Sequence, residues 1–229
     1  MIPFDAVLFD CDGVLVDSET ITNRVLRDML EEIGWRMTLA ESMAIFVGHA
    51  VRDRRALIEA NTGKSFSEDW LAAFWQRRNS ALEAELLIVP GAMAAVQALH
   101  KACNGRIACA SGADRGKIEM QLRKALLMPY FEGRIYSGHE CARNKPHPDV
   151  YLAAAAALKV DPARAAVIED TANGSAAGLA AGATVFGYCP GGPGHDSAEA
   201  LRAVGVLHLF SDMAQLPAVL ADAKGGSIT

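Results

Sequence analysis

Short apolar runs alternate along the chain with segments of helical periodicity. The first run, residues 6–9, has the length and the β-prone content of a buried strand. Strands that alternate with helices at this spacing are typical of βαβ units, so the pattern predicts an α/β fold with a doubly wound, mainly parallel, Rossmann-like sheet. Further strands are expected within 106–111, 133–138, 165–170, 184–188 and 204–209, and helices over 92–101, 117–125, 150–158, 171–181 and 213–223.

Residues 18–87 show helical periodicity alone, with breaks at Gly34, Gly48 and Gly63. The expected helices are 18–33, 39–46, 52–61 and 67–87. An all-helical insert between the first and second strands predicts a small all-helical cap domain over the end of strand one. We therefore expect an α/β core of 1–16 and 88–229 and a cap of 17–87. The glycine-rich segment 224–229 is expected to be loosely held.

Two carboxylates, Asp10 and Asp12, follow the first strand directly. Ligands bind beyond the carboxyl ends of parallel strands, so both side chains are expected at the mouth of a site. Like charges this close repel unless a proton or a cation lies between them, and Mg²⁺ is the cation that oxygen ligands favour here. A solvated turn is the alternative interpretation of such an Asp-x-Asp pair.

Three later stretches place polar groups near expected strand ends. Ser111-Gly112 offers a hydroxyl and backbone N–H groups to an anionic oxygen, although a serine there can also simply cap a helix. Lys145 lies among prolines that stiffen its backbone, although a lone lysine in a loop is usually at the surface. Glu169-Asp170 ends an apolar run, where acids are costly unless they bind something.

Composition narrows the classes of function. The 229 residues are 51% hydrophobic and 21% charged, with a net charge of −5 and no basic stripe, so we expect a globular protein without a nucleic-acid partner. The five cysteines form no CxxC pair, which indicates reduced thiols in a cytoplasmic protein. We expect no signal peptide and no membrane span, since no apolar run approaches about 18 residues.

The four polar stretches together, in this order and spacing, resemble the haloacid dehalogenase superfamily of phosphotransferases. The helical insert resembles the cap of its β-phosphoglucomutase and phosphoglycolate phosphatase branch, and the likeness covers nearly the whole chain. It rests on residues 10–18, Ser111, 145–149 and 169–174.

This resemblance implies a Mg²⁺-dependent phosphatase. Asp10 would be the nucleophile that forms an aspartyl-phosphate, and Asp12 would be the general acid and base. Ser111, with Gly112, and Lys145 would bind the phosphoryl oxygens. The implied metal ligands are Asp10, Asp170, the backbone carbonyl of Asp12, and Glu169 near the metal or through water.

Some residues depart from relatives that are mutases. Thr22 stands where those relatives carry a cap histidine, and Val51 stands where they carry an arginine, with Arg52 one residue later. Both departures count against a β-phosphoglucomutase-like mutase. A dehalogenase is disfavoured because Asp12 and the 169–170 acids are present. A non-catalytic binding or sensor module is disfavoured because Asp10 is present.

The cap carries positive charge that suits a second anionic group on the substrate, although a solvated helix face is the alternative. His49 and Arg78 are the preferred substrate-binding candidates among His49, Arg52, Arg54, Arg55, Arg77 and Arg78. We therefore expect a phosphatase for a small phosphorylated metabolite, a sugar or sugar-acid phosphate, working as a monomer or small homo-oligomer.

Overall fold

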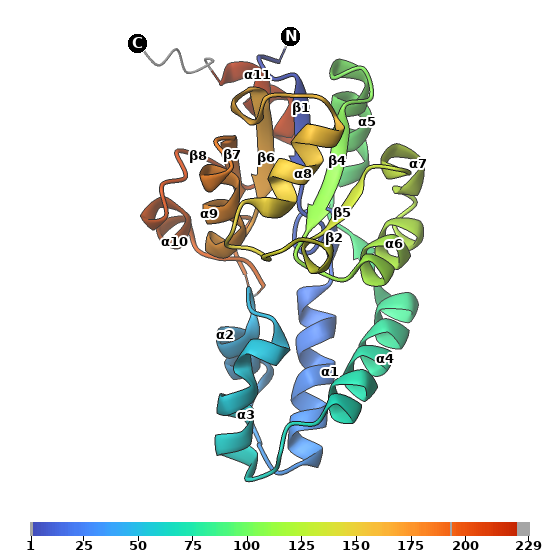
Figure 1. The fold of residues 1–229 in the computed structure, drawn as a ribbon, viewed down its shortest axis with the longest axis vertical. Helices are drawn as coiled ribbons and strands as arrows, with labels where there is room; N and C mark the ends of the chain where they lie inside the picture. The colour runs from blue at the N-terminus through green and yellow to red at the C-terminus, as the bar shows by residue number, and fades with distance from the viewer. Residues whose placement is uncertain (1, 193, 224–229) are drawn as a thin grey trace.

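The computed structural model describes residues 2–192 and 194–223, so the expectation for 224–229 lies outside the described residues. A six-stranded sheet has the order β5-β4-β1-β6-β7-β8, and every neighbouring pair is parallel (Figure 1). The predicted α/β fold class is therefore confirmed. The strands are β1 (Ala6–Phe9), β4 (Ile107–Ser111), β5 (Ile135–Ser137), β6 (Ala165–Glu169), β7 (Thr184–Tyr188) and β8 (His208–Phe210).

Both faces of this sheet are covered, because successive strand side chains point to opposite sides. Val7 and Phe9 pack in one hydrophobic cluster, whereas Leu8 packs in another. The first cluster contains residues of α5 (Ala92–Ala102), α6 (Arg115–Lys124), α7 (Met128–Phe131) and α11 (Leu216–Asp222). The second contains residues of α8 (Asp149–Ala157), α9 (Ala172–Ala180) and α10 (Ala198–Ala203).

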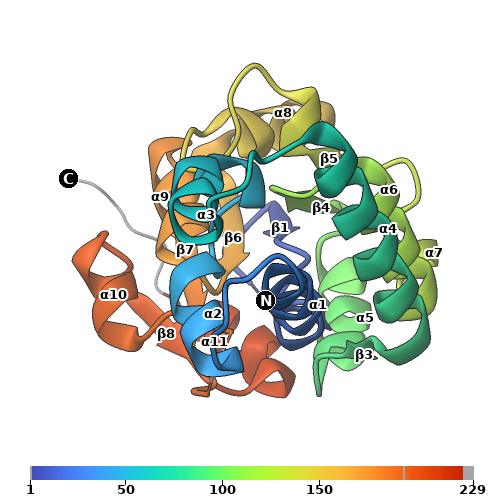
Figure 2. The ribbon, with the colours of Figure 1, turned by 90° about the horizontal axis from the view of Figure 1, so that it is seen from below.

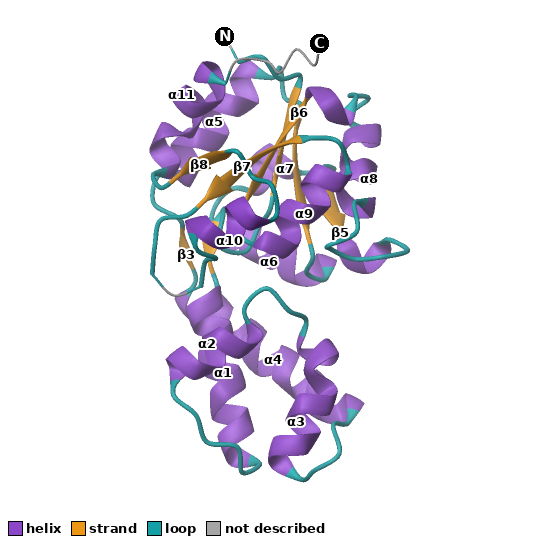
Figure 3. Cartoon of the chain, turned by 90° about the vertical axis from the view of Figure 1, so that its left-hand side faces the viewer, coloured by secondary structure: helices purple, strands orange, loops and turns teal. Residues whose placement is uncertain are grey.

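Four helices form a separate unit beside the carboxyl ends of the strands (Figures 1 and 3). They share their own buried cluster, which includes Leu26, Leu30, Phe46, Leu71 and Phe74. We propose that this unit is the cap and that it folds around a core of its own. Its helices are α1 (Glu19–Glu32), α2 (Leu39–Phe46), α3 (Arg55–Thr62) and α4 (Glu68–Glu85).

Two very short strands join the two units. β2 (Val16–Asp17) pairs antiparallel with β3 (Leu87–Ile88), so the chain leaves and re-enters the core at one place. The sequence pattern does not predict this pair, because two residues carry too little periodicity to reveal a strand. We propose the pair as the boundary between core and cap.

Some other elements differ from their expected bounds. The sequence pattern does not predict α7 or α10, whose four and six residues are too few for a clear helical period. β8 begins at His208 because Gly205 takes a left-handed turn before it. The last helix is split into the 3₁₀ turn Met213–Gln215 and α11.

The strand order reverses direction at β1. From β1 the chain proceeds to β4 and β5 on one side, then returns to β6, β7 and β8 on the other. A crevice forms at such a switch point, outside the carboxyl ends of the strands. Figure 2 shows the cap helices over this end of the sheet.

Two helical glycines should respond oppositely to alanine. A Cβ on Gly178 of α9 would lie 2.8 Å from Val185 Cγ2 and 3.0 Å from Val167 Cγ1, whereas a Cβ on Gly116 of α6 meets only Asp114 Oδ1, at 3.4 Å. Gly178→Ala should destabilise the protein by about 1–3 kcal/mol through overpacking. Gly116→Ala should stabilise it by about 0.5–1 kcal/mol through helix propensity. Urea denaturation of both variants measures this difference, and equal changes would contradict the packing of α9 on the sheet.

Candidate active site

The carboxyl ends of three adjacent strands meet at one cavity of about 550 Å³. Asp10 follows β1, Ser111 ends β4, and Glu169 ends β6 with Asp170 directly after it. Lys145, from the loop before α8, lines the same cavity, as do residues of the cap. The fold thus brings together the strand-end residues that the sequence analysis singled out.

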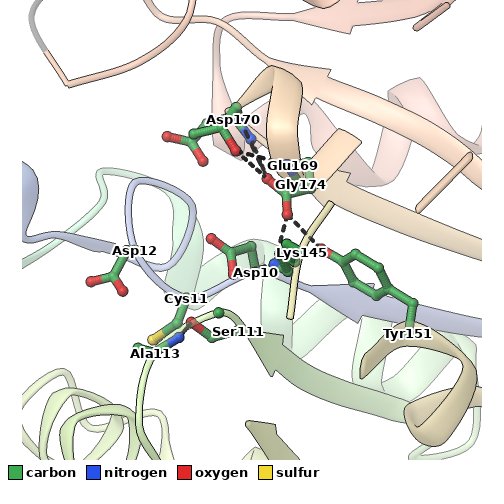
Figure 4. Close-up of polar contacts among 12 residues, drawn as sticks. Asp10, Cys11, Asp12, Ser111, Ala113, Lys145, Tyr151, Glu169, Asp170 and Gly174 are labelled. Atoms are coloured by element: carbon green, nitrogen blue, oxygen red, sulfur yellow. Dashed lines mark hydrogen bonds and ion pairs between the residues drawn. The ribbon is translucent and has the colours of Figure 1, made fainter. Parts of the chain in front are cut away.

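Lys145 lies at the centre of a buried polar network (Figure 4). Its Nζ is 2.7 Å from Asp10 Oδ1, 2.7 Å from Glu169 Oε1 and 3.0 Å from the hydroxyl of Tyr151. The Tyr151 hydroxyl in turn donates to Glu169 Oε1 at 2.6 Å. Although burial opposes the charge, Asp10 and Glu169 raise the pKa of the Lys145 ammonium well above its ordinary value. Lys145 is therefore a buried, fixed positive charge and not a surface lysine.

Three carboxylates share the centre of this site with Lys145. Asp10, Glu169 and Asp170 each offer an oxygen, and these oxygens lie within 4.8 Å of one another. Burial first, and then the neighbouring carboxylates, raise the pKa of Asp170 well above its ordinary value. Burial also raises the pKa of Asp10 to about 7, against the opposing effect of Lys145.

The donor set fits a hard cation. Asp170 Oδ1 is buried and has no hydrogen-bond partner within the described part of the chain, which is costly unless a cation binds it. Glu169 differs, since its Oε1 accepts from Lys145 and Tyr151, and its Oε2 accepts from the backbone N–H of Asp170 at 3.2 Å. Asp10 and Asp170 are thus the carboxylates best able to hold a metal, whereas the oxygens of Glu169 already accept hydrogen bonds.

Two glycines let the backbone approach these acids. Gly13 has φ +74°, and a Cβ there would overlap the Asp170 carboxylate. A Cβ on Gly174, in the first turn of α9, would overlap the Glu169 carboxylate. Any larger residue at either position would displace a carboxylate of the cluster.

Asp12 departs from the expectation that it shares one cation with Asp10 through its side chain. Its carboxylate lies apart from the cluster (Figure 4) and accepts from Lys117 Nζ at 2.8 Å, from Gln121 Nε2 at 2.7 Å and from the Ser18 hydroxyl. Against the effect of burial, these donors hold the pKa of Asp12 down at about 2. With Oδ1 held in this way, the side chain of Asp12 lies apart from the cluster, and the family resemblance assigns only its backbone carbonyl to a metal.

Ser111 and Gly112 lie where a phosphoryl oxygen could be bound. Ser111 Oγ accepts from the Ala113 N–H at 3.2 Å, so its own O–H stays available as a donor. The alternative of a helix cap does not hold, because Asp114 caps α6 by accepting from the Lys117 N–H at 2.9 Å. The Gly112 carbonyl accepts from Asn144 Nδ2 at 2.8 Å, and this bond connects the loop to the segment that carries Lys145.

The cap candidates divide into two groups. Arg78 is 7% exposed, lines the cavity and donates to Asp114 Oδ2 at 3.3 Å. His49 and Arg52 also line the cavity, although Arg52 forms an exposed pair with Glu68. Burial lowers the pKa of the His49 imidazole. Arg55 and Arg77 instead form exposed pairs, with Glu59 and Glu32. The sequence preference for His49 and Arg78 therefore agrees with their places beside the cavity.

Four residues near this site escaped the sequence analysis. They are Glu19, Lys117, Gln121 and Tyr151. Lys117 and Gln121 had a signal, since they lie on the same helical face as the apolar Ile118 and Leu122. Burial, and next the charge of Asp12, raises the pKa of Glu19 to about 7. No pattern in the sequence distinguishes Glu19 or Tyr151 from ordinary helical positions.

Comparison with known proteins identifies the family. The model of the haloacid dehalogenase-like hydrolases matches residues 4–182. The chain belongs to this family. Within it, the chain is 28% identical over 186 residues to the 6-phosphogluconate phosphatase of Escherichia coli K12, a match that covers 81% of this chain and 82% of the relative. The family expected from the sequence is confirmed.

Two further relatives cover almost the whole chain. The plasmid phosphoglycolate phosphatase of Cupriavidus necator is 30% identical over 231 residues, covering 97% of this chain and 96% of its own. The crystal structure of a haloacid dehalogenase family hydrolase from Deinococcus radiodurans, with bound phosphate and sodium, is 37% identical and superposes with a TM-score of 0.80 over 100% of both chains. Among the helices that the structure describes, none is long and apolar enough to cross a membrane.

The Tyr151 hydroxyl should contribute measurably to the free energy of unfolding. Tyr151→Phe removes the donor to Glu169 and the acceptor for Lys145, so we expect a loss of about 0.5–1.5 kcal/mol. Tyr136→Phe is the matched control, because the Tyr136 hydroxyl bonds to no described residue, and it should change stability by less than about 0.5 kcal/mol. Urea denaturation measures both variants, and equal effects would contradict a role for Tyr151 in the network.

Proposed function

We propose that the chain is a Mg²⁺-dependent phosphatase that hydrolyses a small phosphorylated metabolite through an aspartyl-phosphate on Asp10. One observation carries the proposal: the Asp10 carboxylate follows a central strand, is bound by the buried Lys145 ammonium at 2.7 Å, and belongs to a cluster with Asp170 that fits a cation. Its family and the phosphatases among its relatives support the same reaction.

The residues of the site have different roles in phosphoryl transfer. Asp10 attacks phosphorus, while Lys145, the Ser111 hydroxyl and the Gly112 N–H bind the phosphoryl oxygens and stabilise their charge. Asp12 protonates the leaving oxygen and later takes a proton from the attacking water. Mg²⁺, held by Asp10, Asp170 and the Asp12 carbonyl with Glu169 beside it, would neutralise negative charge on the phosphoryl group.

The walls of the cavity favour a sugar or sugar-acid phosphate. Arg78 supplies a cationic group from the cap, and His49 supplies an imidazole N–H, which suits a carboxylate or other anionic group on the substrate. Arg52 lines the cavity as well, although its guanidinium also pairs with Glu68. Glu19 and Asp114 supply acceptors for sugar hydroxyls at the same wall. Two relatives are named as a 6-phosphogluconate phosphatase and a phosphoglycolate phosphatase. These names support a substrate that carries a carboxylate as well as a phosphate.

A phosphate-release screen with Mg²⁺ tests the proposed reaction. The panel contains 6-phosphogluconate, phosphoglycolate, hexitol phosphates and hexose phosphates, and we expect a sugar or sugar-acid phosphate to be hydrolysed. Asp10→Asn should lower kcat by at least about 10³-fold, because it removes the nucleophile, and Asp222→Asn, exposed on α11, is the matched control. Interconversion of hexose phosphates without phosphate release would mean a mutase, and near-normal turnover in Asp10→Asn would refute the role of Asp10.

The stability of the metal-free protein should depend on pH in a defined direction. The pKa of Asp10 is raised to about 7, and that of Asp170 is raised well above its ordinary value. Their protonated forms stabilise the folded state fully below the unfolded pKa of about 3.9, and this contribution is lost as pH rises through the folded pKa values. The metal-free protein should therefore lose stability between about pH 4 and 7.

Because a cation needs these carboxylates deprotonated, Mg²⁺ should raise the melting temperature more at pH 8 than at pH 5. At pH 8 and 100-fold above its Kd, the stabilisation should reach about 2.7 kcal/mol. Asp170→Asn should reduce the effect of Mg²⁺, and Asp69→Asn, exposed on α4, should not. An equal effect of Mg²⁺ at both pH values, or in Asp170→Asn and the wild type, would contradict the assigned ligands.

A further inference from the structure

The carboxylate of Asp12 is held entirely through one of its oxygens. Oδ1 accepts from Lys117 Nζ at 2.8 Å, from Gln121 Nε2 at 2.7 Å and from the Ser18 hydroxyl. No described residue forms a hydrogen bond with Oδ2, and Asp12 lines the cavity. The two oxygens of this side chain therefore have different surroundings.

Two of these donors come from one face of α6. Lys117 and Gln121 are four residues apart, so they lie one above the other on the helix. Lys117 is 6% exposed and Gln121 is 0% exposed, and such burial is costly unless the polar groups are bound. Asp12 Oδ1 binds both the Lys117 ammonium and the Gln121 amide NH₂.

Cys11 fixes the orientation of Gln121. The thiol of Cys11, between the two aspartates, donates to Gln121 Oε1 at 3.4 Å. With Oε1 bound there, the Gln121 NH₂ group is the end that faces Asp12. A reversed amide would face Asp12 with an oxygen, and that contact would be repulsive.

We propose that Lys117 and Gln121 are positioning residues that anchor Asp12 Oδ1, so that Oδ2 is the oxygen that exchanges protons in the reaction. An oxygen that already faces an ammonium and an amide NH₂ has no room for a proton of its own, because both groups only donate. A proton that the Asp12 carboxylate takes up during the reaction therefore binds to Oδ2. This inference rests on the proposed phosphatase reaction.

The proposed steps balance on this oxygen. As the Asp10 oxygen bonds to phosphorus and the ester P–O bond breaks, the Oδ2 proton passes to the leaving oxygen, which departs as an alcohol. Water then attacks the phosphorus, gives one proton to Oδ2, and the bond from phosphorus to the Asp10 oxygen breaks. The enzyme returns to its starting state, and ester plus water has become alcohol plus phosphate.

A double-mutant cycle tests whether Lys117 acts through Asp12. Lys117→Met should lower kcat for an alkyl phosphate ester roughly 10- to 100-fold, part of the 10²–10⁴-fold that acid–base catalysis supplies, with KM changed less than about threefold. In an Asp12→Asn background the same change should cost less than about threefold, since the group it positions is already gone. Lys117→Arg should recover part of the loss. Lys124→Met, exposed on the same helix, is the control and should match the wild type.

The leaving group supplies a second readout. p-Nitrophenolate leaves without a proton, so Lys117→Met should still form the aspartyl-phosphate from p-nitrophenyl phosphate. Hydrolysis of this aspartyl-phosphate should be slow in the variant, because it requires Asp12 to accept a proton from water. A burst of p-nitrophenol release should therefore precede steady turnover. A purely structural defect would instead lower both steps and give no burst.

Several outcomes would overturn the role of Lys117. Equal losses in the wild-type and Asp12→Asn backgrounds would do so, as would a rise in KM with kcat unchanged, which would make Lys117 a substrate-binding residue. If Lys117→Met fails to fold, Gln121→Leu goes through the same cycle with the same expectations. Absence of wild-type turnover would refute the phosphatase proposal itself, whereas wild-type turnover with equal losses would refute only this inference.

Discussion

The excess of buried negative charge at the end of β1 is the constraint on which the site depends. Three carboxylates offer oxygens within 4.8 Å of one another, and Lys145 is the cation that the described chain places among them. Such a cluster must bind protons or a metal, because like charges repel strongly where water is excluded. The raised pKa values of Asp10 and Asp170 express that repulsion. A folded state that keeps these acids together is thereby prepared to bind a cation.

The surrounding structure holds the two aspartates of the first motif in different environments. Asp10 lies with Lys145 and the acids at the end of β6, whereas the Asp12 side chain contacts α6 and Ser18. Under the proposed reaction, one carboxylate attacks phosphorus and the other transfers protons. α6 also meets the cap through Asp114, which accepts from Arg78 of α4 and caps the turn that carries Lys117. The position of the cap and the position of Asp12 are therefore joined through the first turn of one helix.

The sequence predicted the parts of the site that stand at strand ends. An apolar run followed by acids is a pattern within one stretch, and parallel pairing then brings Asp10, Ser111 and Glu169 together whatever the details of packing. Lys117, Gln121 and Tyr151 could not be placed in this way, because their contacts depend on how helices pack against the strand ends. The hydroxyl of Ser18 shows the same limit: a serine before a helix predicts a cap, yet this one donates to Asp12.

The central claim is that Asp10 carries the phosphoryl group during turnover. It is tested most directly by acid quenching during hydrolysis of p-nitrophenyl phosphate with Mg²⁺, followed by peptide mapping by mass spectrometry. We predict a phosphoryl group on the peptide that contains Asp10, labile to hydroxylamine as an acyl phosphate is, and its absence in Asp10→Asn. A phosphoryl group on another residue would contradict the claim. So would the absence of any phosphorylated peptide in samples quenched while phosphate is being released in a burst.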